Sequence, residues 1–108
     1  MKCIKLKDFE EPYITKGSIL RFYTMGFQVE KNVDFMVFYP SESNCGLGLI
    51  TITGFNAGDI LVKLPAESIH SNQYTLSTEW LIKNWNKWIC EKCNVNNVYI
   101  IEGYPDPV

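Results

Sequence analysis

Apolar positions follow two different spacings along this chain, and these spacings divide it into strands and one late helix. Segments rich in β-branched and aromatic residues, bounded by Gly, Pro, Asn or Asp, predict β-strands. Residues 2–7 alternate and predict an edge strand, whereas Pro12 and Gly17 break any regular pattern that follows. Two glycines give residues 54–58 the character of a hairpin connection, and residues 66–76 are typical of a polar loop. Further strands are predicted at 19–27, 33–39, 47–53, 59–64 and 97–102.

The one long helical pattern lies between Ser77 and Cys93. Apolar residues recur there at the spacing of a single helical stripe, with Lys and Asn on the other side. Ser77 or Thr78 would cap the first turn, and the Asn-rich run after Cys93 would end the helix. Trp85 and Trp88 are expected core positions on this stripe. We expect replacement of either by Ala to lower the free energy of unfolding by about 3–5 kcal/mol. The stripe comprises Leu81, Trp85, Trp88 and Ile89.

Trp80 lies away from this stripe, by about 140° at roughly 100° per residue. It therefore either packs on a neighbouring part of the chain or is held ready for a partner. We favour packing on the chain just before the helix. The enrichment of aromatic residues in the centres of interfaces supports the second interpretation.

The order of these elements predicts an α+β fold. We expect a curved, mostly antiparallel sheet of about five or six strands, with one C-terminal amphipathic helix packed on it. The 108 residues contain no linker or repeat, so residues 1–108 should form a single domain. Both alternating sets of strand residues are apolar in places, so the face opposite the helix also needs cover. We expect the sheet to curl, and the alternatives are the N-terminal segment or another protein.

Composition and charge exclude several classes of partner. The net charge is −2, the pI is near 5.3, and Arg21 is the only arginine, which disfavours general nucleic-acid binding. No segment is long and apolar enough to span a membrane. The N-terminus has lysines but lacks the apolar region of a signal peptide, so we expect a cytoplasmic protein.

The four cysteines do not form a recognisable metal or redox motif. In a cytoplasmic chain they should be reduced. Cys90 and Cys93 form a C-x-x-C at a helix C-terminus, where the helix dipole disfavours a thiolate. Cys3, Cys45 and His70 are isolated positions and do not supply the second half of a zinc site. We therefore expect incidental thiols, with no metal, no cofactor and no required disulfide.

No group of residues predicts catalysis. His70, the only histidine, lies in a polar loop with Ser68, Ser71 and Glu67, and we interpret it as a solvated side chain rather than a catalytic base. Asp34 interrupts a strand, where it either faces water or accepts hydrogen bonds. We therefore expect that the chain is not an enzyme.

Several segments together are similar to those of a known family. The chain resembles the bacterial immunity protein 45 family of polymorphic toxin and contact-dependent inhibition systems over about residues 19–102. This resemblance implies a small cytoplasmic protein, monomeric when free, that binds and neutralises one toxin domain delivered by a neighbour or made by its own cell. A mildly acidic protein suits a nuclease toxin, whose active site is built to hold phosphate. The matching segments are residues 33–37, 52–58, 61–65, 80–88 and 98–100.

The toxin should be bound by acids and exposed aromatic residues outside the helical stripe. Two other functions remain open: a single-strand nucleic-acid or ligand-binding module that uses sheet aromatics as a stacking platform, and an uncharacterised enzyme or thiol-redox protein that uses Cys90 and Cys93. Basic residues on the strands are sparse, which weakens the first of these. The aromatics concerned are Phe22, Tyr23, Phe38, Tyr39 and Tyr99. The expected contact residues are Glu42, Glu79, Trp80, Glu102, Tyr104 and Asp106.

Overall fold

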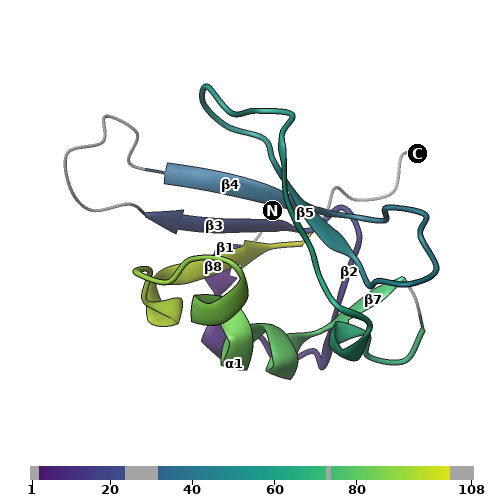
Figure 1. Ribbon diagram of the computed structural model, residues 1–108. Coiled ribbons are helices and arrows are strands. Elements are labelled where there is room, and N and C mark those ends of the chain that lie inside the picture. The colour runs from purple at the N-terminus through teal and green to yellow at the C-terminus, as the bar shows by residue number, and fades with distance from the viewer. Residues whose placement is uncertain (1–2, 24–31, 73, 103–108) are drawn as a thin grey trace, which may run out of the picture.

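A computed structural model describes residues 3–23, 32–72 and 74–102, and within them six strands form one antiparallel sheet (Figure 1). The strand order is β1-β8-β3-β4-β5-β6, so β1 and β6 are the edges. This confirms the predicted α+β class, the edge position of the first strand and the approximate number of strands. The strands are β1 (Cys3–Lys5), β3 (Ile19–Tyr23), β4 (Asn32–Phe38), β5 (Gly48–Thr51), β6 (Ile60–Lys63) and β8 (Val98–Ile101).

A second, two-stranded sheet was not predicted. Strand β2 (Tyr13–Thr15) pairs antiparallel with β7 (Thr75–Ser77), which lies partly within the segment predicted to be a polar loop. Ile14 lies opposite Leu76, and both side chains are buried. Each strand has only three residues, too few to show an alternating pattern, and the two are brought together from distant parts of the sequence. That part of the loop prediction is therefore wrong.

Helix α1 (Thr78–Trp88) begins where the sequence predicts and ends earlier. The Ser77 hydroxyl accepts a hydrogen bond from the Trp80 backbone N–H at 3.1 Å, which makes Ser77 the N-cap. After Trp88 the chain turns, and the side-chain amide of Asn86 donates to three carbonyls of that turn. The acceptors are the carbonyls of Cys90 (3.1 Å), Glu91 (3.2 Å) and Cys93 (2.7 Å).

The same turn joins Cys90 and Cys93 in a disulfide. Their Cα atoms are 5.3 Å apart, a separation typical of disulfides. The expectation that these two cysteines are reduced is therefore wrong for this structure, because it was based on compartment and motif rather than on the path of the chain. Cys3 and Cys45 are free thiols.

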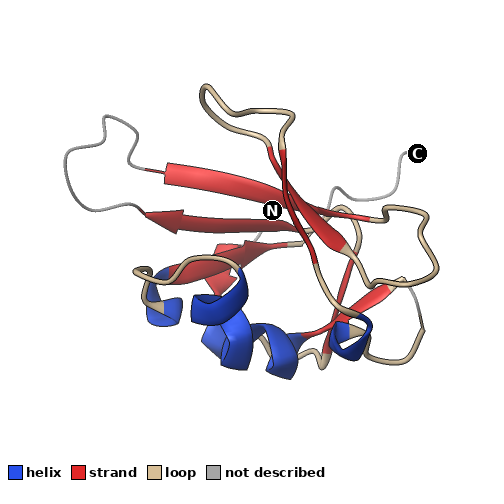
Figure 2. Cartoon of the chain, viewed as in Figure 1, coloured by secondary structure: helices blue, strands red, loops and turns tan. Residues whose placement is uncertain are grey.

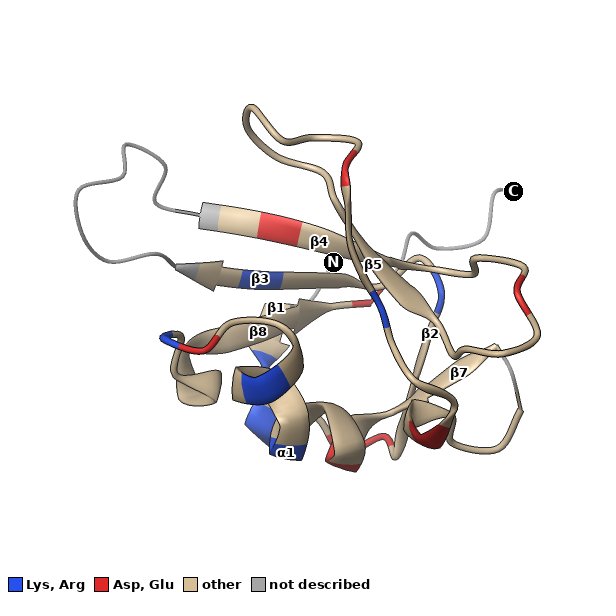
Figure 3. Ribbon diagram, in the orientation of Figure 1, with Lys and Arg blue, Asp and Glu red and all other residues tan. Residues whose placement is uncertain are grey.

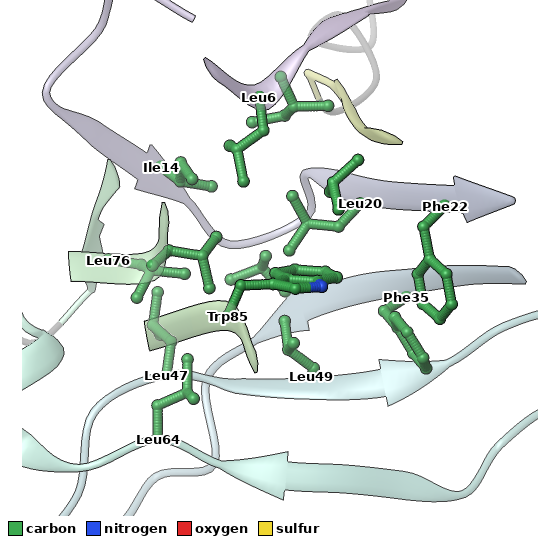
Figure 4. Packing of buried hydrophobic residues seen from close by; sticks show 14 residues of the cluster. Leu6, Ile14, Leu20, Phe22, Phe35, Leu47, Leu49, Leu64, Leu76 and Trp85 are labelled. Carbon is green, nitrogen blue, oxygen red and sulfur yellow. The ribbon is translucent and has the colours of Figure 1, made fainter. Parts of the chain in front are cut away.

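The core lies between one face of the large sheet and α1. Leu20, Phe22 and Phe35 extend from the sheet towards Trp85, which is fully buried at the centre (Figure 4). The rings of Phe22 and Trp85 meet edge to face, with centroids 5.9 Å apart. The indole nitrogen of Trp85 has no hydrogen-bond partner among the described residues, and it lies on the side of the two phenylalanines.

The far end of the helical stripe is less buried than predicted. Leu81 and Trp85 are fully buried, which confirms the stripe, but Trp88 and Ile89 are only partly buried. Trp80 is also partly buried, and its ring contacts that of Trp88 with a centroid distance of 6.0 Å. Trp80 thus packs within the chain, with the Trp88 ring as one of its contacts.

The second face of the large sheet carries apolar side chains together with the Arg21–Asp34 ion pair, and no helix of the described residues covers it. The described helices lie on the opposite side (Figure 2). Strand β1 joins the sheet edge, and Ile14 of β2 belongs to the core on the helix side, so neither strand crosses the second face. On this face the Phe38 ring covers Gly48, where an added Cβ would lie 2.7 Å from a ring carbon. A glycine here allows the aromatic ring to pack flat on the neighbouring strand.

Candidate partner-binding surfaces

The structure brings Glu79 and Glu102 to two adjoining cavities that share part of the N-terminal segment. One cavity, of about 410 Å³, lies between residues 9–12 and the start of α1, and Glu79 lines it. The other, of about 270 Å³, is lined by Glu102, and Phe9 and Glu11 line both. We define the carboxylates around these cavities as the acidic surface. It comprises Glu10, Glu11, Glu79 and Glu102.

A buried threonine holds the N-terminal segment against the helix at this surface. The Thr78 backbone N–H donates to the Pro12 carbonyl at 3.1 Å, and its hydroxyl donates to the Glu11 carbonyl at 2.9 Å. Thr78 is only 5% exposed. The contact joins residues 67 positions apart, so no local pattern could indicate that Glu10 and Glu11 lie beside Glu79.

Only one of these four acids has a described ionic partner. Glu79 accepts a hydrogen bond from the Lys83 ammonium at 2.7 Å, and this bond lowers the pKa of Glu79. The pair lies one helical turn apart and is solvent-exposed, so its contribution to folding is small. Glu10, Glu11 and Glu102 form no ion pair with another described residue. The surface is therefore negative overall.

Two of the other predicted contact residues, Glu42 and Trp80, are not among those that line these cavities. Glu42 is in the loop between β4 and β5, where it binds Lys63 of β6 at 2.5 Å. Trp80 packs against Trp88, and Tyr104 and Asp106 lie outside the described residues. Each of the six positions remains a predicted contact residue.

The ion pair of Glu42 and Lys63 predicts a measurable pKa difference. The hydrogen bond from Lys63 lowers the pKa of Glu42. Because the folded-state pKa is depressed, the stabilisation from this pair is present above the ordinary carboxyl pKa and is lost as pH falls through the folded-state value. We expect Lys63→Met to raise the pKa of Glu42 in a carbon-detected NMR titration.

The matched control for this titration is Lys83→Met, at the other exposed pair. It should raise the pKa of Glu79 and leave that of Glu42 unchanged. A Glu42 titration curve that is the same with and without Lys63 would contradict the pairing.

The connection between β5 and β6 presents a separate, apolar surface. Phe55 is 100% exposed, and three apolar side chains of the same hairpin are also exposed. The connection extends from the sheet on the side away from α1 (Figure 1). The sequence predicted the hairpin but gave no sign that Phe55 is outside the core, since an apolar residue among strands is compatible with either place. We call this surface the hairpin tip, comprising Ile52 (37% exposed), Phe55, Ile60 (51%) and Leu61 (41%).

The base-stacking alternative left open by the sequence gains little from the structure. Phe22 faces the core, whereas Phe38 lies on the other face of the sheet over Gly48, so these aromatics do not form one stacking platform. His70 is exposed and stacks on Tyr13, with ring centroids 5.7 Å apart.

Asp34, which the sequence left as either facing water or accepting hydrogen bonds, accepts hydrogen bonds. It accepts two bonds from the Arg21 guanidinium, at 2.8 and 2.9 Å.

Among the described residues, no three His, Cys, Asp or Glu side chains gather in a way that could hold a metal ion. The helices of the described ranges are too short or too polar to cross a bilayer.

Comparison with known proteins identifies the family. The chain matches the family described as Immunity protein 45 over residues 6–100, which is most of its length. It therefore belongs to that family of immunity proteins. Searches of curated proteins and of solved structures gave no match.

Proposed function

We propose that this protein binds one toxin domain in the cytoplasm and neutralises it by blocking its active site or its access to substrate. The observation that carries this proposal is the family match over residues 6–100. An inhibitor of this kind needs a stable scaffold and one complementary surface, and it catalyses no reaction. The antiparallel sheet and its single core supply the scaffold.

We further propose that the toxin is a nuclease. The net charge of −2 and the acidic surface support this, because a nuclease active site is built to hold phosphate and is typically cationic. Opposite potentials accelerate association and disfavour partners of the wrong charge.

Co-expression with a toxin domain tests the function. The domain to use is the C-terminal toxin domain encoded beside the gene for this chain. We expect that domain to stop growth when expressed alone and growth to resume when this chain is expressed with it. The purified pair should elute as a stable complex, and the chain should inhibit cleavage of DNA or RNA in proportion to its amount.

The control is an unrelated toxin domain, which should remain toxic in the presence of this chain. A folded chain that neither restores growth nor forms a complex would contradict the proposed function. Restored growth together with a toxin domain that cleaves neither DNA nor RNA would contradict only the nuclease assignment.

A further inference from the structure

The hairpin tip exposes more apolar side chain than the fold requires. A singly exposed apolar residue is ordinary, but here a fully exposed phenylalanine lies in the same hairpin as Ile52, Ile60 and Leu61. None of these four side chains belongs to the buried core or is among the partly buried residues packed against it. Their exposure therefore has no explanation in the folding of this chain.

The backbone of the tip is held in one conformation. Gly58 donates to the Thr51 carbonyl at 2.7 Å, and Thr51 donates to the Asp59 carbonyl at 2.9 Å. Within the turn, Ala57 donates to Gly54 at 3.1 Å, and both Gly54 and Gly58 have the positive φ that favours glycine. Such a turn leaves the backbone around Phe55 little conformational entropy to lose on binding.

The base of the tip is also tied to the centre of the sheet. The Ile52 N–H donates to the Asp34 carbonyl at 3.0 Å, and the Asp34 N–H donates to the Thr53 hydroxyl at 3.1 Å. Asp34 is itself fixed by Arg21 through two hydrogen bonds. The exposed phenylalanine is thus carried by a rigid support, as is common for residues that dominate an interface.

The charge around the tip selects among classes of partner. Asp59 is the only charged residue between Ile52 and Leu61, and the segment contains no Lys or Arg. The hairpin in Figure 3 accordingly shows acidic but no basic colour at its tip. Nucleic acids and anionic membranes require cations that this surface lacks. A protein pocket that is apolar inside and neutral or basic at its rim fits both Phe55 and Asp59.

A second copy of this chain fits less well than the toxin. Strand β6 is an edge, but its pairing with β5 is irregular between Leu49 and Ile50, and Lys63 lies at its end. Irregular pairing and an edge lysine both oppose strand-to-strand association. Four side chains also bury far less than the roughly 800 Å² per partner of a stable interface. The tip therefore suits part of a larger contact with the protein partner that the family implies.

We infer that the hairpin tip is the anchor of the complex, with Phe55 inserted into an apolar pocket of the toxin domain. This inference rests on the proposed function. It places the apolar anchor at the hairpin tip and leaves the acidic surface, whose carboxylates are exposed to water, to accelerate association with a cationic toxin. A buried aromatic anchor lengthens the life of a complex, whereas peripheral charges mainly change its rate of formation.

Binding kinetics of Phe55→Ala with the purified toxin domain test the inference. We expect the dissociation constant to rise at least about 30-fold, chiefly through faster dissociation, with an unchanged melting temperature. Phe55→Leu should retain most of the affinity because it keeps an apolar side chain. The matched control is Tyr13→Ala, which removes a partly exposed aromatic beside the acidic surface and should bind like the wild type.

The outcomes separate the inference from the proposed function. A Phe55→Ala variant that binds as tightly as the wild type overturns the inference while the proposed function stands. So does a large loss of affinity confined to Tyr13→Ala or to Glu10→Gln combined with Glu11→Gln, since the toxin would then lie on the acidic surface. A wild-type chain that does not bind the toxin domain overturns both.

Discussion

Replacing Trp85 with Ala should reduce the free energy of unfolding by about 3–5 kcal/mol, the range found for large-to-small changes in cores. Trp85 is fully buried between α1 and the sheet, and its ring contacts the edge of Phe22. The surrounding side chains come from several strands as well as the helix, so they cannot all collapse into the space left behind. Urea unfolding monitored by circular dichroism would measure the loss.

Trp88→Ala is the matched control for this experiment. The helical stripe predicts equal losses for the two tryptophans, but Trp88 is only partly buried and so should lose clearly less. A loss below about 1 kcal/mol for Trp85→Ala would contradict its central place in the core. Equal losses for both variants would mean that Trp88, through its contact with Trp80, contributes more to stability than its partial burial indicates.

Asp34→Asn should lower the free energy of unfolding by about 2 kcal/mol. Asp34 is 7% exposed and accepts two bonds from Arg21, which lies opposite it on β3. The amide cannot accept both bonds, and it leaves the guanidinium without its counter-charge. Urea unfolding of Asp34→Asn, Arg21→Met and the double variant would give the coupling between the two residues.

Glu79→Gln provides the comparison, because it breaks the exposed pair with Lys83. Its unfolding curve should match that of the wild type. Independent, additive effects of the Asp34 and Arg21 substitutions would contradict the coupling. A variant of Asp34 that also weakens toxin binding would agree with the role of this residue in supporting the hairpin.

The large elements of the fold could be predicted because their patterns are local. Runs of four or more residues rich in β-branched and aromatic side chains marked β3, β4, β5, β6 and β8, and the spacing of Leu81 and Trp85 marked α1. Strands β2 and β7 could not be found this way, since each is three residues long and exists through its pairing with the other. The disulfide was missed for a similar reason, because it depends on the chain turning after Trp88.

The candidate surfaces could be predicted only in part. Glu79 and Glu102 were identified as exposed acids, but their shared surroundings depend on Thr78 binding the segment before β2. Glu42 was grouped with them, although it lies with Lys63 near the edge strand. Phe55 was assigned to a turn, and nothing in its sequence context separates an exposed phenylalanine from a buried one.

On the inference that Phe55 anchors the toxin, the turn that carries it separates binding from folding. Its glycines and backbone hydrogen bonds set the shape of the loop, while the side chain at position 55 contacts no part of the core. Residues at this position can therefore change at little cost to stability. An immunity protein built in this way can follow a changing toxin by altering its loop, while the sheet and helix beneath it stay the same.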